Sequence, residues 1–235
     1  AGGGADTVEV GGRAGATSLG AGDDAATVEG GAGTVDAGAG RDEIWIDGGA
    51  DAIILGDGDD WLTVTPGHVG TVDAGAGADV VATSGFIETT DLGAGDDTLT
   101  ASDRVGTVDG AGGDDVIHLF DGGVAYGGAG DDVLTTEDDG GKLFGEGGND
   151  TLVFNLGHTA RDAADMLVDG GSGHDVLTVE LGSGDDALVT ELVRDLSDGA
   201  FDGTLHDPLG DGVLRVEGVE EIRIAGSEFD VTFVV

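Results

Sequence analysis

An aspartate recurs along this chain at almost constant intervals, and that spacing constrains the fold more than any other feature. We call these residues the marker aspartates: Asp6, Asp24, Asp42, Asp60, Asp79, Asp97, Asp115, Asp132 and Asp150. The differences in residue number between successive markers are 18, 18, 18, 19, 18, 18, 17 and 18. A repeat of this length is typical of a solenoid, in which each unit is one coil and buries its apolar face only against its neighbours.

Paired glycines stand four and two residues before most markers. The pairs are Gly20 and Gly22, Gly38 and Gly40, Gly56 and Gly58, Gly75 and Gly77, Gly93 and Gly95, and Gly128 and Gly130. Before Asp115 and Asp150 the glycines shift by one residue, to Gly112–Gly113 and Gly147–Gly148. After each marker, residues two and four positions on are mostly apolar, as in Ile44 and Ile46. This period of two predicts a strand with an inward face.

A second, degenerate turn signal lies halfway between markers. The positions of a second aspartate are held by Gly15, Gly33, Asp51, Gly70, Glu88 and Gly106, and apolar residues follow them at Val35, Ile53, Val72, Val108 and Leu143. Each unit is therefore predicted to be an acidic turn, a strand, a glycine turn and a strand. Coils stack with their strands parallel and about 4.8 Å apart. We expect an all-β, right-handed parallel β-roll, a β-solenoid of about nine coils, over residues 1–155.

The regular spacing ends after Asp150. Residues 157–167 contain no turn glycines beyond the first and leave room for a short helix. The glycine–aspartate pattern returns at residues 170–178 with Asp175, and again with Asp186, after much less than one regular interval. We assign 156–190 to an insertion with out-of-register repeats, and 191–235 to a C-terminal cap. The strand-like runs 213–216, 222–224 and 231–235 would close the exposed end of the solenoid.

Composition restricts the partners of this chain. Acidic residues outnumber basic ones 49 to 8, for a formal charge of −41, which opposes a compact state unless cations neutralise it. Nucleic acid is excluded as a partner, because phosphate binding needs clustered Lys and Arg. There is no cysteine, hence no disulfide and no thiolate metal site. No apolar run approaches the ~20 residues of a membrane span.

The segment Gly127–Thr135 fits the nonapeptide G-G-x-G-x-D-x-U-x at every fixed position, and so does Gly170–Thr178. Residues 1–190 resemble the RTX (repeats-in-toxin) family of secreted β-roll proteins. The resemblance lies in this motif, in the repeat length and in the apolar residues that follow each marker on the inward face. The resemblance implies calcium sites between turns of successive coils, with glycine-rich turn carbonyls and the motif aspartate as ligands. It also implies export by type I secretion, to the cell surface or beyond. Residues 228–235, acidic and then aliphatic, look like the uncleaved secretion signals of this family.

Elementary chemistry supports calcium independently. Calcium prefers six to eight oxygen ligands, and glycines allow carbonyls to point inward. Nine markers leave eight spaces between coils, so up to eight ions on one edge would add +16 and change the formal charge from −41 to −25. Folding would then be coupled to binding. Predicted ligands are the markers, Asp175, Asp186 and the paired glycines; the opposite edge is expected to bind few ions or none, with Asp51 and Glu88 as its only candidates.

No pattern in the chain indicates catalysis. The five histidines lack HxxxH spacing, no serine lies in G-x-S-x-G, and the carboxylates are too numerous for any pair to be informative. We expect a non-catalytic protein.

Three functions stay open. The chain could be a calcium-dependent module that accompanies another activity, or a self-assembling subunit of a surface layer, matrix or filament. Ultracentrifugation in calcium separates these two. It could also be an adhesin or ice-binding module, with outward threonines at Thr27, Thr63, Thr100, Thr135 and Thr178. Trp45 and Trp61 share the same predicted outer face, where they would either pack under the C-terminal segment or form an intermolecular contact.

Overall fold

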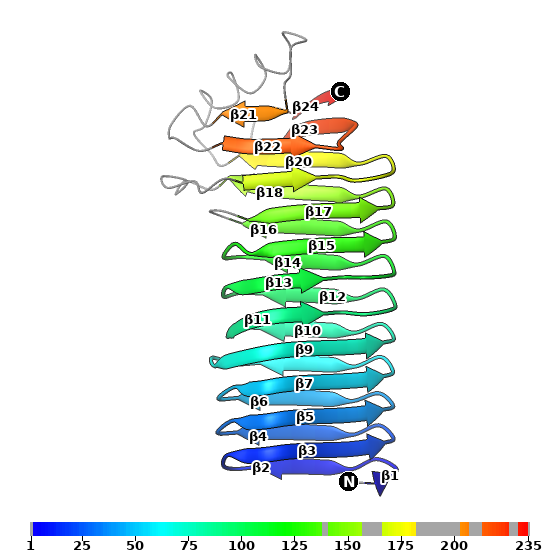
Figure 1. Cartoon of the computed structure of the whole chain (residues 1–235), viewed down its shortest axis with the longest axis vertical. Coiled ribbons are helices and arrows are strands. Elements are labelled where there is room, and N and C mark those ends of the chain that lie inside the picture. The colour runs from blue at the N-terminus through cyan, green and yellow to red at the C-terminus, as the bar shows by residue number, and fades with distance from the viewer. Residues whose placement is uncertain are drawn as a thin grey trace.

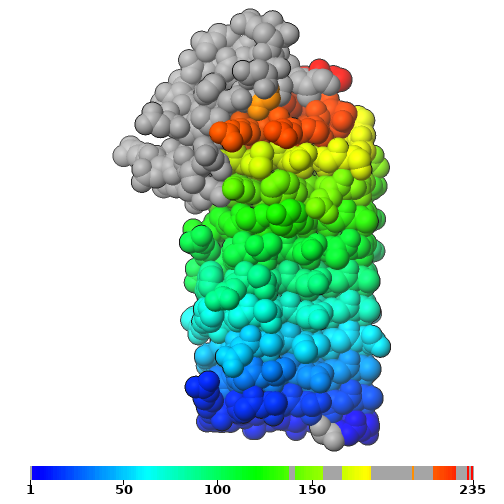
Figure 2. All heavy atoms as spheres, viewed as in Figure 1, coloured from blue at the N-terminus to red at the C-terminus, as the bar shows by residue number. Residues whose placement is uncertain are grey.

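The chain winds into a β-solenoid in which each regular coil spans one interval between marker aspartates. In the computed structural model, residues 2–137, 141–156, 166–181, 203–206, 213–225 and 230–234 are described, and this part of the chain contains strands and no helix. Successive coils stack along one axis, with the N-terminal coil at one end and the last strands at the other (Figure 1). In the space-filling view the coils form a straight-sided column (Figure 2).

Two sheets of twelve strands form the walls of the solenoid. In spatial order, sheet A consists of β1 (Gly2–Gly3), β3 (Ala14–Ala21), β5 (Ala32–Ala39), β7 (Ala50–Asp57), β9 (His68–Ala76), β11 (Phe86–Asp91), β13 (Val105–Asp109), β15 (Val124–Ala129), β17 (Lys142–Gly147), β19 (Met166–Asp169), β22 (Val213–Glu217) and β21 (Thr204–His206). Sheet B consists of β2 (Thr7–Val10), β4 (Ala25–Glu29), β6 (Glu43–Asp47), β8 (Trp61–Val64), β10 (Val80–Thr83), β12 (Thr98–Ala101), β14 (Val116–Leu119), β16 (Val133–Glu137), β18 (Thr151–Leu156), β20 (Val176–Leu181), β23 (Glu221–Ala225) and β24 (Asp230–Val234). Equivalent strands of successive coils pair in parallel, as β4, β6 and β8 do. The predicted parallel stacking is confirmed.

The core is a narrow aliphatic column between the two sheets. In β6, Ile44 and Ile46 are buried while Glu43 and Trp45 face out, as the period of two predicts. Val35 and Ile53 supply the opposite wall from β5 and β7. Each fully buried side chain of this size contributes about 1.5–3 kcal/mol. A further inward column was not predicted; it lies near or just after the ends of the sheet A strands and consists of Leu19, Ala37, Leu55, Ala74 and Leu92.

The second turn of each coil lies earlier in the chain than predicted. Gly33 and Asp51 lie inside β5 and β7, and the same holds for Gly15, Gly70, Glu88 and Gly106 in β3, β9, β11 and β13. The turns themselves fall at pairs such as Gly30–Gly31 and Gly48–Gly49, whose φ angles are all between 93° and 118°. The predicted turn positions were wrong because Ala32 and Ala50, which come just before them, are buried and already belong to the strands that follow the turns.

Beyond Asp150 the stack continues before it ends. β19 and β20 pair in parallel with β17 and β18, and β22 and β23 extend both sheets. β21 and β24 then pair antiparallel with β22 and β23, which confirms the three strand-like runs predicted at this end. The proposed helix at 157–167 lies outside the described residues, except for Met166 and Leu167 in β19. The limits of the three predicted regions stay a prediction.

A helix with the length and apolar character needed to cross a bilayer does not occur in the described part of the chain.

Candidate metal-binding edge

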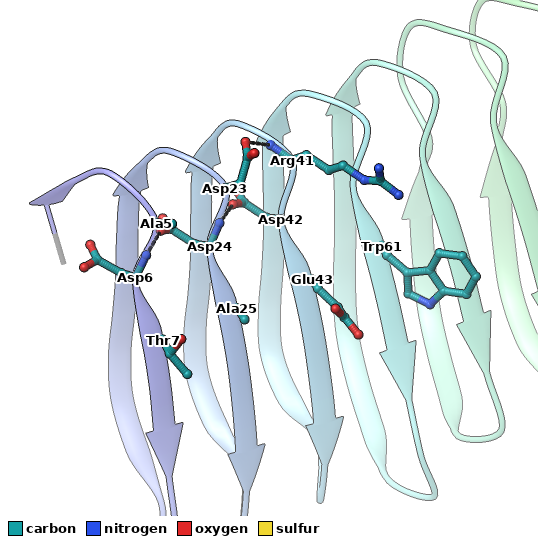
Figure 3. A pocket seen from close by; sticks show the side chains of 10 residues that line it. All are labelled: Ala5, Asp6, Thr7, Asp23, Asp24, Ala25, Arg41, Asp42, Glu43 and Trp61. Atoms are coloured by element: carbon teal, nitrogen blue, oxygen red, sulfur yellow. Dashed lines mark hydrogen bonds between the residues drawn. The ribbon is translucent and has the colours of Figure 1, made fainter.

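All marker aspartates lie on one edge of the solenoid, where the chain passes from sheet A into sheet B. The backbone N–H of each marker donates to Oδ1 of the marker in the next coil, at 2.6 Å from Asp6 to Asp24 and 2.7 Å from Asp24 to Asp42. Figure 3 shows these first two bonds. The series runs unbroken to Asp150 and then reaches Asp175, at 2.9 Å. We call this row the aspartate ladder.

The second oxygen of each carboxylate is buried and has no hydrogen-bond partner. Nine ladder residues are at most 3% exposed, and Oδ2 is unpartnered in every one of them. They are Asp24, Asp42, Asp60, Asp79, Asp97, Asp115, Asp132, Asp150 and Asp175. An unpaired polar atom in a protein interior costs several kcal/mol, and a charged one costs more. The protein atoms at this edge therefore leave nine buried carboxylate oxygens without a hydrogen-bond partner.

The environment of the ladder opposes ionisation. The pKa of Asp79 and Asp115 is raised to about 7, chiefly by burial and also by the charges of neighbouring aspartates, although the N–H donated by the preceding marker acts to lower it. Burial likewise raises the pKa of Asp60, Asp97, Asp132 and Asp150 to about 6. The pKa values of Asp42 and Asp175 are also raised, again chiefly by burial. A cation beside these oxygens would reverse the preference.

A second row of hydrogen bonds joins successive turns. Here the side-chain oxygen accepts from the following coil, whereas in the ladder it accepts from the preceding coil. The residue before a marker accepts the backbone N–H of the equivalent residue in the next coil, as Asp23 Oδ1 does from Arg41 at 3.0 Å and Asp131 Oδ1 does from Asn149 at 2.7 Å. Asp59, Asp96, Asp114 and Asn149 act in the same way. These turn N–H groups thus have partners within the protein, whereas the ladder Oδ2 atoms do not.

The predicted turn glycines are required for two reasons. All twelve of the paired glycines that precede a marker by four and two residues have positive φ, for example 113° at Gly56 and 139° at Gly58. A Cβ on Gly58 would also collide with the carbonyl of Gly40 in the coil below. Before Asp115 and Asp150, Gly113 and Gly148 keep the later position, while the earlier one is held by Ala111 and Glu146 at φ of 66° and 69°.

Backbone carbonyls approach the unpartnered oxygens in the C-terminal coils. A Cβ on Gly110 would meet both Asp115 Oδ2 and the carbonyl of Gly127, and a Cβ on Gly145 would meet both Asp150 Oδ2 and the carbonyl of Gly170. These glycines, with Gly127 and Gly170, stand five residues before their markers and were not among the predicted site residues. The first glycine of the nonapeptide is the signal that identifies them.

The donor set fits a hard cation. Throughout the described residues, no three His, Asp or Glu side chains gather at one point. An ion on this edge would therefore take one carboxylate oxygen from the ladder and the rest of its ligands from backbone carbonyls. Calcium tolerates such a mixed oxygen shell, whereas zinc and copper sites rely on imidazole or thiolate.

The remaining predicted ligands lie elsewhere. Asp51 is exposed at the start of β7, and Glu88 bonds His68 at 3.1 Å in β11 and β9, so the two acids do not form a common site. Asp186 lies outside the described residues.

No protein-family model and no curated protein matches this chain. Among solved structures, the chain is similar to a hyperactive, Ca2+-dependent, β-helical antifreeze protein from an Antarctic bacterium, with a TM-score of 0.55 and 17% sequence identity. The match covers 97% of this chain and 93% of that one. At this identity, the comparison establishes a shared β-solenoid fold.

Proposed function

We propose that this chain is a secreted, non-catalytic calcium-binding β-solenoid of the RTX kind, which becomes compact when it binds calcium. The observation that supports this most strongly is the row of nine buried Oδ2 atoms without partners. The calcium dependence of the structurally similar protein agrees with it.

In this proposal, backbone carbonyls and aspartate side chains have different roles in calcium binding. Turn carbonyls such as those of Gly127 and Gly170 lie near the ladder, and the ladder would contribute one carboxylate oxygen per coil. Bound calcium supplies positive charge next to oxygens that the fold buries. Without it, the compact state must either protonate these carboxylates or bury their charge, and a formal charge of −41 opposes compaction further. The unfolded chain has neither cost, because its carboxylates are solvated.

Circular dichroism with and without a chelator at about pH 7.5 tests this proposal. We expect the strand signal to be lost in chelator and restored by calcium, with a midpoint of about 0.1–1 mM, as in extracellular calcium modules. Asp79→Asn should raise that midpoint severalfold. Asp73→Asn removes the same charge from an exposed position on sheet A and serves as the matched control. Strand content that survives chelation in the unmodified chain would refute the proposal.

Ice binding is a second candidate, and one surface favours it. On the outer face of sheet A, Thr71, Thr89 and Thr107 align in consecutive coils, two residues from the aligned Asp73, Asp91 and Asp109. This makes a flat array of hydroxyls and carboxylates that repeats about every 4.8 Å. The predicted threonines on sheet B are less regular, because Trp45, Ala82, His118 and Val153 alternate with them in register.

Thermal hysteresis of the calcium-loaded protein tests this candidate. Thr89→Tyr should abolish the effect, whereas Thr135→Tyr on sheet B should leave it unchanged. Absence of hysteresis in the unmodified protein would remove ice as a ligand.

A further inference from the structure

Two tryptophans project from the outer face of sheet B. Trp45 and Trp61 are each 48% exposed, and they stand on the adjacent strands β6 and β8. Trp45 pairs in register with Thr63, two residues after Trp61 on the same face, so the two Cα atoms lie about 8 Å apart on the diagonal. The indole N–H of Trp61 donates to Thr63 Oγ1 at 3.2 Å, which fixes the ring on the sheet. They are the only tryptophans in the chain.

A surface hollow lies beside the ring of Trp61. Small residues, Thr7 and Ala25, precede Glu43 and Trp61 at equivalent positions of successive coils. They form the floor of a hollow of about 490 Å³, which Glu43 and Trp61 border on one side (Figure 3). A second hollow of about 270 Å³, bordered by Glu9 and Glu29, lies at the far end of the same strands. The first volume is within the range of ligand sites.

The charges around both hollows are mostly negative. Asp23 and Glu43 border the first, together with the ladder residues Asp6, Asp24 and Asp42, so this hollow adjoins the metal-binding edge. Arg41 is the one cation among its lining residues, and its side chain extends from the turn toward the coil of Trp61 (Figure 3). Glu9 and Glu29 border the second, which no basic residue lines. Even eight bound calcium ions would leave the chain near −25, so a second copy or a nucleic acid would be repelled from this face.

We propose that this face, from Thr7 to Trp61 on sheet B, binds an extended basic peptide segment of a partner protein. Aromatic rings with half-exposed faces attract guanidinium and ammonium groups, and tryptophan does so most strongly. Arginine also stacks flat on such rings. Carboxylates at both ends of strands β2 and β4 would pair with further basic side chains of a segment lying along them. Tryptophan is also over-represented among the residues that dominate binding energy at interfaces.

Intrinsic tryptophan fluorescence tests the proposal directly, because both fluorophores lie at the site. The probe is a synthetic nonapeptide of alternating arginine and serine, added to the calcium-loaded protein at about 0.15 M salt to screen diffuse attraction. We expect a saturable fluorescence change with one peptide per chain. Affinities of variants are measured by calorimetry, and their folding in calcium by circular dichroism.

Trp61→Ala and Trp45→Ala should each weaken binding about tenfold, and Glu43→Gln about threefold. Phe120→Ala and Glu217→Gln change an exposed aromatic residue and an exposed acid away from this face, and should alter the affinity less than twofold. Equal affinity for the Trp→Ala variants and the unmodified protein would show that only net charge attracts the peptide. A neutral oligosaccharide that saturates the tryptophan signal while the peptide does not would also overturn the proposal.

Discussion

At the scale of single residues, each marker aspartate uses its two carboxylate oxygens differently. Oδ1 accepts the backbone N–H of the preceding coil and so fixes the stacking of the turns. Oδ2 is buried without a partner, and in our proposal it binds a cation. Asparagine could preserve the first role but not the charge of the second. The hydrogen bond at Oδ1 and the proposed role of Oδ2 together explain aspartate at this position.

The turn glycines allow a matched test of close stacking. Gly58→Ala places a Cβ against the carbonyl of Gly40 at a φ of 139°, so we expect a loss of about 3 kcal/mol. Gly112→Ala is the control, because its Cβ would meet no atom within 4 Å. Its cost should stay below about 0.5 kcal/mol. Thermal unfolding in calcium measures both, and an equal loss for the two variants would contradict the stacking described for this edge.

At the scale of strands, the columns two and four residues after a marker could be predicted because apolar residues alternate there with polar ones. The inward column of Leu19, Leu55 and Leu92 could not, since each of these stands directly before a turn glycine and looks like part of the turn. Ala111 and Glu146 show the same limit, because they have a left-handed backbone that neither residue type predicts. Pairing between coils, one full repeat apart in sequence, decides these positions.

Two buried threonines of the same coil, Thr83 in sheet B and Thr90 in sheet A, predict opposite effects of the same substitution. Thr90 Oγ1 in β11 has no partner, and its register neighbours are Val72 and Val108. Thr90→Val should stabilise the protein by about 1 kcal/mol. Thr83 Oγ1 donates to the carbonyl of Gly85 at 2.8 Å and accepts its N–H at 3.0 Å, so Thr83→Val should destabilise by about 1–2 kcal/mol. Calcium-loaded thermal melts give both signs, and a destabilising Thr90→Val would show that its hydroxyl is satisfied.

At the scale of the whole molecule, the ladder predicts an unusual pH dependence. Six ladder carboxylates have pKa values of about 6 to 7 in the folded chain, against 3.8 for the ordinary group. At a pH between these two sets of pKa values, the folded state therefore binds more protons than the unfolded state. The stability of the calcium-free chain consequently falls as pH rises from about 4 to 7. Calcium should reverse this trend, since it competes with protons for the same oxygens.

Thermal melts at about pH 5 and pH 8 check this, with the protein dialysed free of metal and with calcium added. Without calcium, a melting transition is expected at the lower pH, and a lower melting temperature or no folded signal at the upper pH, whereas the calcium-loaded melting temperature should be higher at the upper pH. A calcium-free melting temperature that rises with pH would mean that the ladder is ionised and satisfied in another way.

The aspartate spacing predicted the stacking of the coils up to Asp150 and the common edge of the markers. It did not predict that the ladder carboxylates are buried, because a repeated G-x-G-x-D pattern is equally compatible with a solvated turn. The burial of Asp79 or Asp115 follows only from the coils above and below them.

Small-angle X-ray scattering at neutral pH, before and after calcium is added to the metal-free chain, tests most directly whether cations on the ladder make the chain compact. We predict a radius of gyration near 50 Å without calcium, as for an unfolded chain of this length, and about 20 Å with it. The same compact radius in both conditions would contradict the central claim.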